Sequence, residues 1–305
     1  MVGDLVEDIV VWFDGALRPA DDNPARIVRT RGGSAANVAA FAARLGTPAR
    51  FIGRVGADPL GAQLVATLDS AGVDVRVQRQ GVTGTIVVLV DPAGERTMFP
   101  DRGAAAELAD VPSEWLDGLD ALHVTSYSFA TEPAAGATLE LLATARRAGL
   151  LVSLDASSSG LLLDLGVARY VGLVQRARPA ILFANAAEAR LLDLEGPPFS
   201  GMVTIVKHGS DPTIVRAPDG ARLALPVAAV EQVRDATGAG DAFAAGFLSA
   251  HLAGEDLAAA VHRGHALARE VLGSPGAGLG PPVPGARAAP APCPPDPTLQ
   301  EPTAR

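Results

Sequence analysis

The spacing of hydrophobic and polar positions changes along the chain and divides it into three regions. In residues 34–45, Ala, Val, Phe and Leu recur at helical spacing, and Gly46 ends this helix. A second helix is predicted at 60–71, after the cap Asp58-Pro59. The other apolar stretches of the first hundred residues are short and rich in β-formers. They predict strands at 9–13, 24–31, 49–55, 73–78, 84–90 and 96–99.

From residue 120 onward, short apolar runs alternate with helical patterns, which indicates a buried parallel sheet with right-handed crossovers. The runs lie at 121–125, 150–154, 180–184 and 202–207, and the helices at 133–148, 166–175, 239–252 and 256–272. Periodicity is lost after Gly273, and ten of the 24 prolines follow it. We therefore expect residues 285–305 to form a Pro-rich, disordered tail.

Composition excludes several classes of protein. The 305 residues carry a formal charge of −9 without a basic cluster, which argues against nucleic acid as a partner. Cys293 is the only cysteine, so neither a disulfide framework nor a thiolate metal cluster can form. No long uncharged apolar segment indicates a membrane span or leader, and we expect a soluble, cytoplasmic protein.

The single lysine, Lys207, narrows the ways in which a nucleotide could be held. No G-x-x-x-x-G-K-[ST] surrounds it, so a P-loop NTPase is excluded. A protein-kinase H-R-D is also missing, because His262-Arg263 is followed by Gly264. Nucleotide phosphates would have to be held mainly by backbone amides.

Two glycine motifs carry the chemistry. Residues 235–241 read D-A-T-G-A-G-D and lead into an apolar, helix-compatible run. Such a turn frees backbone N–H groups at a helix N-terminus, where the helix dipole also favours an anion. Taken alone, the motif fits equally a glycine loop with Asp241 as an ordinary helix cap. Residues 31–39, R-G-G-S-A-A-N-V-A, form the second motif and favour the functional interpretation.

Together these motifs resemble the signatures of the phosphofructokinase-B, or ribokinase-like, family of sugar and nucleoside kinases. Residues 31–39 resemble the family's sugar-side motif G-G-x-x-x-N. Residues 235–241 resemble its phosphate-side motif D-x-[TS]-G-A-G-D. The resemblance implies a three-layer, Rossmann-type α/β core over residues 1–284. It also implies a small β-sheet lid, here from about 9–31 and 73–100, that closes over the substrate and excludes water.

The same resemblance assigns the reacting groups. Asp241 would be the general base, and the backbone of Gly238, Ala239, Gly240 and Asp241 itself would form an anion hole for the transferring phosphoryl group. Gly32, Gly33 and Asn37 would bind sugar hydroxyls, together with Asp8, which follows Gly3 in the family's G-x-x-x-x-D spacing. For Asp8 the alternative is a solvated loop acid, and for Gly33 and Asn37 a helix entry with a polar helix face.

The nucleotide side follows from three more matches. Asn185 and Glu188 resemble the family's N-x-x-E motif, in which Glu places Mg²⁺ largely through water; a helix N-cap with a first-turn Glu is the alternative. Gly209 and Ser210 resemble the nucleotide loop, although Pro212 replaces a usual glycine. His265 aligns with the adenine pocket, but a helical histidine also fits simple packing. Asp235 and Thr237 match a monovalent cation site, for K⁺, or serve only to fix the loop.

The leading hypothesis is an ATP-dependent, Mg²⁺-requiring carbohydrate kinase, with a nucleoside kinase as the nearest alternative. An NAD(P)-dependent oxidoreductase is disfavoured because no G-x-G-x-x-G follows the first strand. A non-catalytic sugar-binding relative is disfavoured by the complete 235–241 motif. The family resemblance further implies a homodimer formed through the lid. The connection between Leu194 and Met202 is shorter than the helical connection usual in the family.

Overall fold

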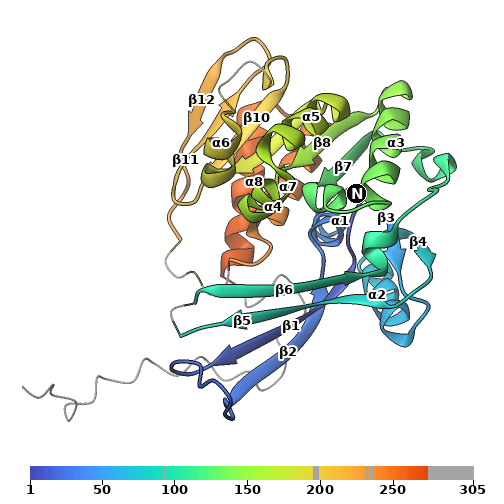
Figure 1. Cartoon of the computed structure of the whole chain (residues 1–305). Coiled ribbons are helices and arrows are strands. Elements are labelled where there is room, and N and C mark those ends of the chain that lie inside the picture. The colour runs from blue at the N-terminus through green and yellow to red at the C-terminus, as the bar shows by residue number, and fades with distance from the viewer. Residues whose placement is uncertain (93, 195–198, 231–232, 234–235, 274–305) are drawn as a thin grey trace, which may run out of the picture.

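The computed structural model describes residues 1–273, except 93, 195–198, 231–232 and 234–235. Its core is an α/β unit built on one sheet. A separate four-stranded sheet projects from this core (Figure 1). The strands are β1 (Val6–Phe13), β2 (Ala25–Gly32), β3 (Ala49–Val55), β4 (Val73–Arg79), β5 (Thr83–Val90), β6 (Arg96–Gly103), β7 (Ala121–Thr125), β8 (Leu151–Asp155), β9 (Ile181–Asn185), β10 (Val203–His208), β11 (Asp211–Arg216) and β12 (Arg222–Leu225).

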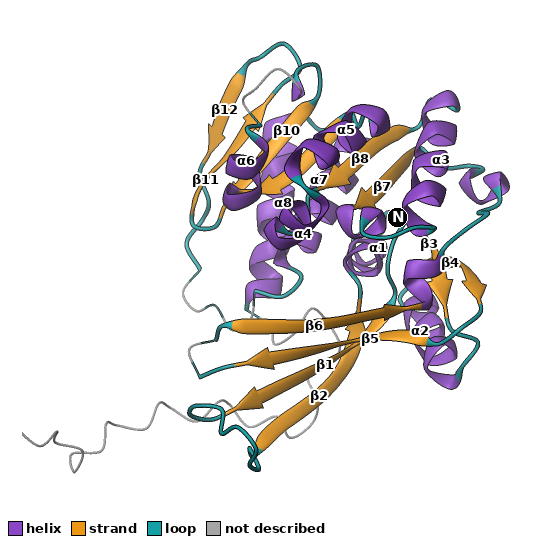
Figure 2. Cartoon of the chain, in the orientation of Figure 1, coloured by secondary structure: helices purple, strands orange, loops and turns teal. Residues whose placement is uncertain are grey.

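The helices cover both sides of the core sheet, as Figure 2 shows. They are α1 (Ser34–Arg44), α2 (Pro59–Ser70), α3 (Ala134–Arg147), α4 (Ser159–Leu165), α5 (Val167–Ala177), α6 (Ala186–Leu192), α7 (Ala239–Leu252) and α8 (Leu257–Leu272). One buried apolar cluster joins the sheet to α1, α2, α7 and α8, and a second joins it to α3, α5 and α6. Because the sheet is sandwiched between these two clusters, the expected three-layer α/β architecture is confirmed.

The core sheet runs in the order β12-β11-β10-β9-β8-β7 and continues through Val2 to β3 and β4. Val2 forms parallel bridges to Ile52 of β3 and to Val124 of β7. Strands β7 to β10 are parallel, so their carboxyl ends share one edge. Polar residues that follow these strands therefore gather at that edge, where open α/β sheets bind their ligands.

The projecting sheet has the order β2-β1-β5-β6. Its strands come largely from the two ranges expected for the lid, but β4, from the second range, pairs in parallel with β3 of the core. The prediction that residues 73–79 belong to the lid was therefore wrong. The reason is the crossover helix α2, which returns the chain beside β3, so that Val75 and Val77 pack against the core.

Candidate active site

The N-termini of α1 and α7 meet, and this contact brings Ser34, Asn37 and Asp241 together. Ser34 Oγ donates a hydrogen bond to Asp241 Oδ1 at 2.5 Å, and Asn37 Nδ2 donates to Asp241 Oδ2 at 2.9 Å. Helix α1 can start at this place because Gly33 precedes it with φ 98°, where an added Cβ would lie 2.1 Å from the main-chain oxygen of Asp4. Only glycine tolerates this backbone and this approach.

The pKa of the Asp241 carboxyl lies close to neutral pH. Burial raises the pKa of the Asp241 carboxyl, the hydrogen bonds from Ser34 and Asn37 oppose that rise, and the result is a pKa of about 6. A carboxyl with this pKa is ionised at neutral pH and yet more basic than an ordinary aspartate. The site thus holds a carboxylate able to accept a proton.

The turn before α7 presents backbone N–H groups beside that carboxylate. Gly238 precedes the helix in a left-handed conformation, and Gly240 and Asp241 lie in its first turn, where N–H groups have no carbonyl partner inside the helix. The N–H of Ala239 donates instead to the oxygen of Ala236 at 3.2 Å. In the expected anion hole, the N–H groups of Gly240 and Asp241 are therefore directed out of the helix end. The N–H of Ala239 already donates to Ala236.

Asp8 lies on β1 and is buried, so the alternative of a solvated loop acid is wrong. Its Oδ1 has no hydrogen-bond partner within the described part of the chain. Burial raises the pKa of Asp8 to about 6, with Arg31 opposing the rise and the Asp241 charge adding to it. An added Cβ on Gly32 would lie 2.0 Å from Asp8 Oδ1, so the glycine leaves room for this carboxylate.

Arg31 connects the two acidic groups. Its Nη1 donates to Asn37 Oδ1 at 2.9 Å, while Asn37 itself donates to Asp241. The Arg31 guanidinium therefore orients the Asn37 amide, which in turn holds the Asp241 carboxylate. Its charge also offsets the negative charges of Asp8 and Asp241, both of which raise the pKa of Arg31 against the effect of its burial.

Asn185 and Glu188 form a complete capping box at the start of α6. Asn185 Oδ1 accepts from the N–H groups of Ala187 and Glu188, and Glu188 Oε2 accepts from the Asn185 N–H at 2.8 Å. The capping alternative is therefore confirmed, and it leaves a metal role open because both can hold. Burial and the nearby Asp155 charge raise the pKa of Glu188.

A partly buried ion pair lies between the residues around Asp241 and the capping box of α6. Lys207 Nζ, at the end of β10, is 3.0 Å from Asp155 Oδ2, at the end of β8. The Lys207 charge interacts with those of Glu188 and Asp241 as well. The hydroxyl of Tyr127 is buried nearby, and its pKa is raised to about 12 by burial and then by the Asp241, Asp155 and Glu188 charges.

The other residues predicted for ATP and cations lie further along the same edge. Gly209 and Ser210 form the exposed turn between β10 and β11. His265 Nε2 and Thr213 Oγ1 are 2.8 Å apart, and the His265 ring packs on Phe243. Thr237 Oγ1 accepts a hydrogen bond from Arg96 of β6, which links the projecting sheet to the loop before α7. Asp235 lies outside the described residues.

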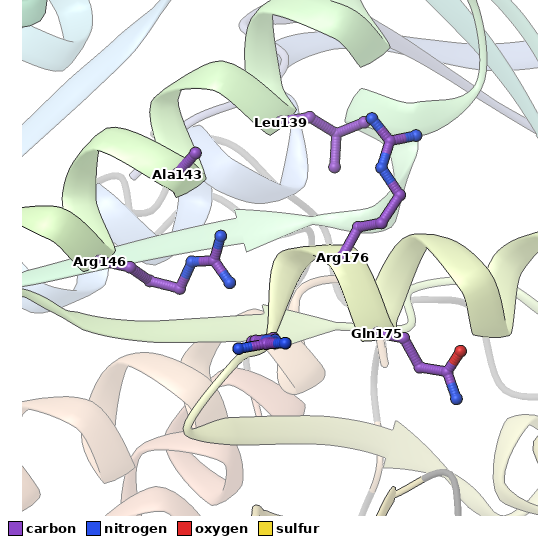
Figure 3. A pocket seen from close by; sticks show the side chains of 6 residues that line it. Leu139, Ala143, Arg146, Gln175 and Arg176 are labelled. Atoms are coloured by element: carbon purple, nitrogen blue, oxygen red, sulfur yellow. The ribbon is translucent and has the colours of Figure 1, made fainter.

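One cavity on the surface is not part of this site. It has a volume of about 410 Å³ and lies between α3 and α5, where Figure 3 shows its arginine side chains. Its lining residues are Leu139, Ala143, Arg146, Gln175, Arg176 and Arg178. None of them is a predicted site residue, so the chemistry is located by the polar cluster at the strand ends.

The sequence matches the pfkB family of carbohydrate kinases over residues 2–284. The chain belongs to this family. Its members are carbohydrate kinases, which agrees with a proton-accepting carboxylate at a helix N-terminus. Within the described residues, the pfkB-family chain has no helix long and apolar enough to cross a membrane, and no cluster of three His, Cys, Asp or Glu side chains suited to a metal ion.

Individual relatives of the pfkB-family chain include proteins named for different acceptors. It is 36% identical over 284 residues to an ATP-dependent ribose-1-phosphate kinase from Halopiger xanaduensis, which covers 88% of this chain and 91% of the relative. A fructokinase from Klebsiella pneumoniae is 32% identical over 82% of this chain and 87% of its own length. Among solved structures, an adenosine kinase from Sinorhizobium meliloti superposes with a TM-score of 0.80 at 24% identity, over 90% of this chain and 94% of its own, which supports the fold.

Sequence reasoning about this pfkB-family chain missed Ser34, Arg31, Asp155 and Lys207. A signal existed for the last two, because both lie at the carboxyl ends of predicted parallel strands, where ligand-binding residues gather. Lys207 was used only to exclude a P-loop, and the expectation that backbone amides would carry the phosphates left no role for it. No comparable signal pointed to Ser34, whose partner lies 207 residues away.

Proposed function

We propose that the protein transfers the γ-phosphoryl group of ATP to a hydroxyl of a small carbohydrate, with Asp241 as the general base. One observation carries the proposal: Asp241 stands in the first turn of α7 and is held by Ser34 and Asn37 from α1. The arrangement puts a proton acceptor directly beside N–H groups suited to a phosphoryl group. Three relatives, named as an ATP-dependent ribose-1-phosphate kinase, a fructokinase and a nucleoside kinase, support it.

Each group has a distinct task in this reaction. The acceptor oxygen bonds to the γ-phosphorus while the bond to the oxygen bridging to ADP breaks, and the hydroxyl proton passes to Asp241. The N–H groups of Gly240 and Asp241 donate to the transferring phosphoryl group. Asp8, with its unpartnered buried oxygen, accepts from an acceptor hydroxyl, assisted by Gly32, Gly33 and Asn37.

The carboxylates at the strand ends fit a magnesium ion that accompanies ATP. Asp155 lies close enough to Glu188 to raise its pKa, so two hard oxygen donors face one region. Glu188 would hold Mg²⁺ through water, with Asn185, Gly209, Ser210 and His265 on the nucleotide side. When bound, the ion neutralises phosphate charge. A K⁺ ion beside Asp235 and Thr237 and a cytoplasmic location remain predictions.

The projecting sheet supports two further parts of the proposal. It carries Asp8, so it would act as a lid over the acceptor. By strand register the face opposite Asp8 presents an apolar patch of Ile9, Val11, Ile27, Val87, Leu89 and Phe99, bordered by Glu7, Arg29, Thr97 and Asp101. Ile27 and Phe99 are 61% and 55% exposed in the single chain. A homodimer through this face would cover them, and light scattering coupled to gel filtration tests it.

An ADP-release assay tests the function itself. Wild-type protein and the Asp241→Asn variant are compared with Mg·ATP and ribose 1-phosphate, ribose, fructose, 2-keto-3-deoxygluconate, adenosine or pseudouridine. Acceptor-dependent ADP release with a sugar, lost in the variant, is expected. Release with a nucleoside alone would assign a nucleoside kinase. Sugar binding without release from any acceptor would instead indicate a non-catalytic relative and refute the proposal.

A further inference from the structure

Lys207 is the one lysine of the chain, and it lies partly buried between Asp155 and the start of α7. Its side chain is 19% exposed, and its Nζ lies 6.0 Å and 5.9 Å from the ring centres of Phe183 and Phe243. Asp155 Oδ2 is 3.0 Å away. Burial would lower the pKa of Lys207, but Asp155, Glu188 and Asp241 together raise it, so the side chain is an ammonium at neutral pH.

The ammonium also lies beside the start of α7. A Cβ added to Gly240 would be 3.4 Å from Lys207 Nζ, the nearest atom to that position. The single lysine and the N–H groups of the first helical turn therefore face the same small volume. This closeness follows from β10 ending next to the helix that carries Asp241.

The N-terminus of α7 by itself disfavours this placement, whereas the Asp155, Glu188 and Asp241 carboxylates favour the ammonium. A helix N-terminus carries a partial positive charge, so a nearby cation is repelled and an anion is attracted. A buried ion pair such as Lys207–Asp155 also has to offset the desolvation of both charges, and is often no more stabilising than apolar residues would be. An anion bound between Lys207 and α7 would be attracted both by the ammonium and by the helix N-terminus.

We propose that Lys207 donates to the transferring phosphoryl group, and that Asp155 is a positioning residue which holds the ammonium against the N-terminus of α7. The inference rests on the proposed kinase function and adds a side-chain cation to its backbone anion hole. Lys207 stays protonated throughout. The phosphorus–oxygen bond to ADP breaks, the bond to the acceptor forms, and the acceptor proton goes to Asp241, while Lys207 stabilises the charge on the phosphoryl oxygens.

The test compares Lys207→Met with wild type in three measurements: kcat with the best acceptor, affinity for Mg·ADP, and affinity for the non-hydrolysable ATP analogue Mg·AMP-PNP. We expect kcat to fall by about 10²–10³-fold, as for loss of one preorganised donor. Affinity for AMP-PNP should fall about tenfold and that for ADP by less than about twofold, because only the analogue carries a γ-phosphate. Arg44→Met, which breaks an exposed ion pair with Glu270 on the surface, is the matched control and should change none of these values.

The double variant Lys207→Met/Asp155→Asn guards against misfolding, because Lys207→Met alone leaves a buried carboxylate without its cation. It should melt near the wild-type temperature and still lose kcat and the preference for AMP-PNP. Equal loss of both nucleotide affinities, or full kcat in the folded double variant, would overturn the inference while leaving the kinase function intact. Wild-type protein that binds neither nucleotide would overturn both. Wild-type protein that binds nucleotides with the expected Lys207 dependence but phosphorylates no acceptor would count against the kinase function alone.

Discussion

Replacing Ser34 with alanine should raise the pKa of Asp241, the proposed catalytic base. The Ser34 hydroxyl donates to Asp241 at 2.5 Å, and a donor to the ionised form lowers a carboxyl pKa. A hydrogen bond to a charged group is worth about 1.5–3 kcal/mol, and one pKa unit corresponds to about 1.4 kcal/mol. Water replaces part of this bond, and Asn37 retains its own. We therefore expect the pKa of Asp241 to move from about 6 to about 7 in Ser34→Ala.

The assay is the pH dependence of kcat/KM for the acceptor between about pH 5 and about pH 9. Activity needs ionised Asp241, so it is lost on the acidic side, and Ser34→Ala should shift that limb upward by about one unit. Asp8 titrates in the same range, so the measured value belongs to the pair of carboxyls. Ser34→Thr, which keeps the hydroxyl, is the control and should retain the wild-type limb. An unchanged or downward-shifted limb in Ser34→Ala would refute the argument.

Four further predictions concern the same site. Asp241→Asn keeps size but removes the basic oxygen, so kcat should fall about 10²–10⁴-fold with nucleotide affinity nearly unchanged; calorimetry checks the second part. Asp8→Ala should chiefly raise the acceptor KM, by a factor equivalent to about 1–3 kcal/mol of binding free energy. A raised KM for ATP instead would reverse its assignment. Gly32→Ala places a Cβ 2.0 Å from Asp8 Oδ1, so it should raise the acceptor KM and lower the melting temperature. In wild type, raised carboxyl pKa values mean that the folded state binds more protons, so stability should decrease from about pH 4 to about pH 6, measured by thermal unfolding.

Local pattern predicted most of the core accurately. The strand at 121–125 and the helix at 239–252 have the expected bounds, because each is a short apolar run with clear stop signals. The helix expected at 166–175 is in fact α5, extended to Ala177 and preceded by α4. The hairpin of β11 and β12 had no predicted counterpart. Its strands are short and half-polar, as befits the edge of a sheet, and give only a weak periodic signal.

What sequence could not provide is which elements meet. Val73–Arg79 is an alternating strand whose local signal is the same whether it joins the core or the projecting sheet. Its place depends on the path of α2, a tertiary property. The same limit applies to the site: the two motifs indicated Asn37 and Asp241 separately. The hydrogen bond between them arises only when the N-termini of α1 and α7 meet, and the Lys207–Asp155 pair only when parallel strands bring distant residues to one edge.

Asp8 and Asp241 belong to different bodies of the molecule. Asp8 is built on β1 of the projecting sheet, whereas Asp241, Ser34 and Asn37 are built on core helices. The gap between the two carboxylates therefore depends on the tilt of the sheet, which substitutions remote from both can alter. Under the proposed role of Asp8, acceptor preference can thus diverge between descendants of one ancestor while every residue around Asp241 stays the same. Substitutions in the projecting sheet can thus change acceptor specificity without any change at the residues proposed to transfer the phosphoryl group.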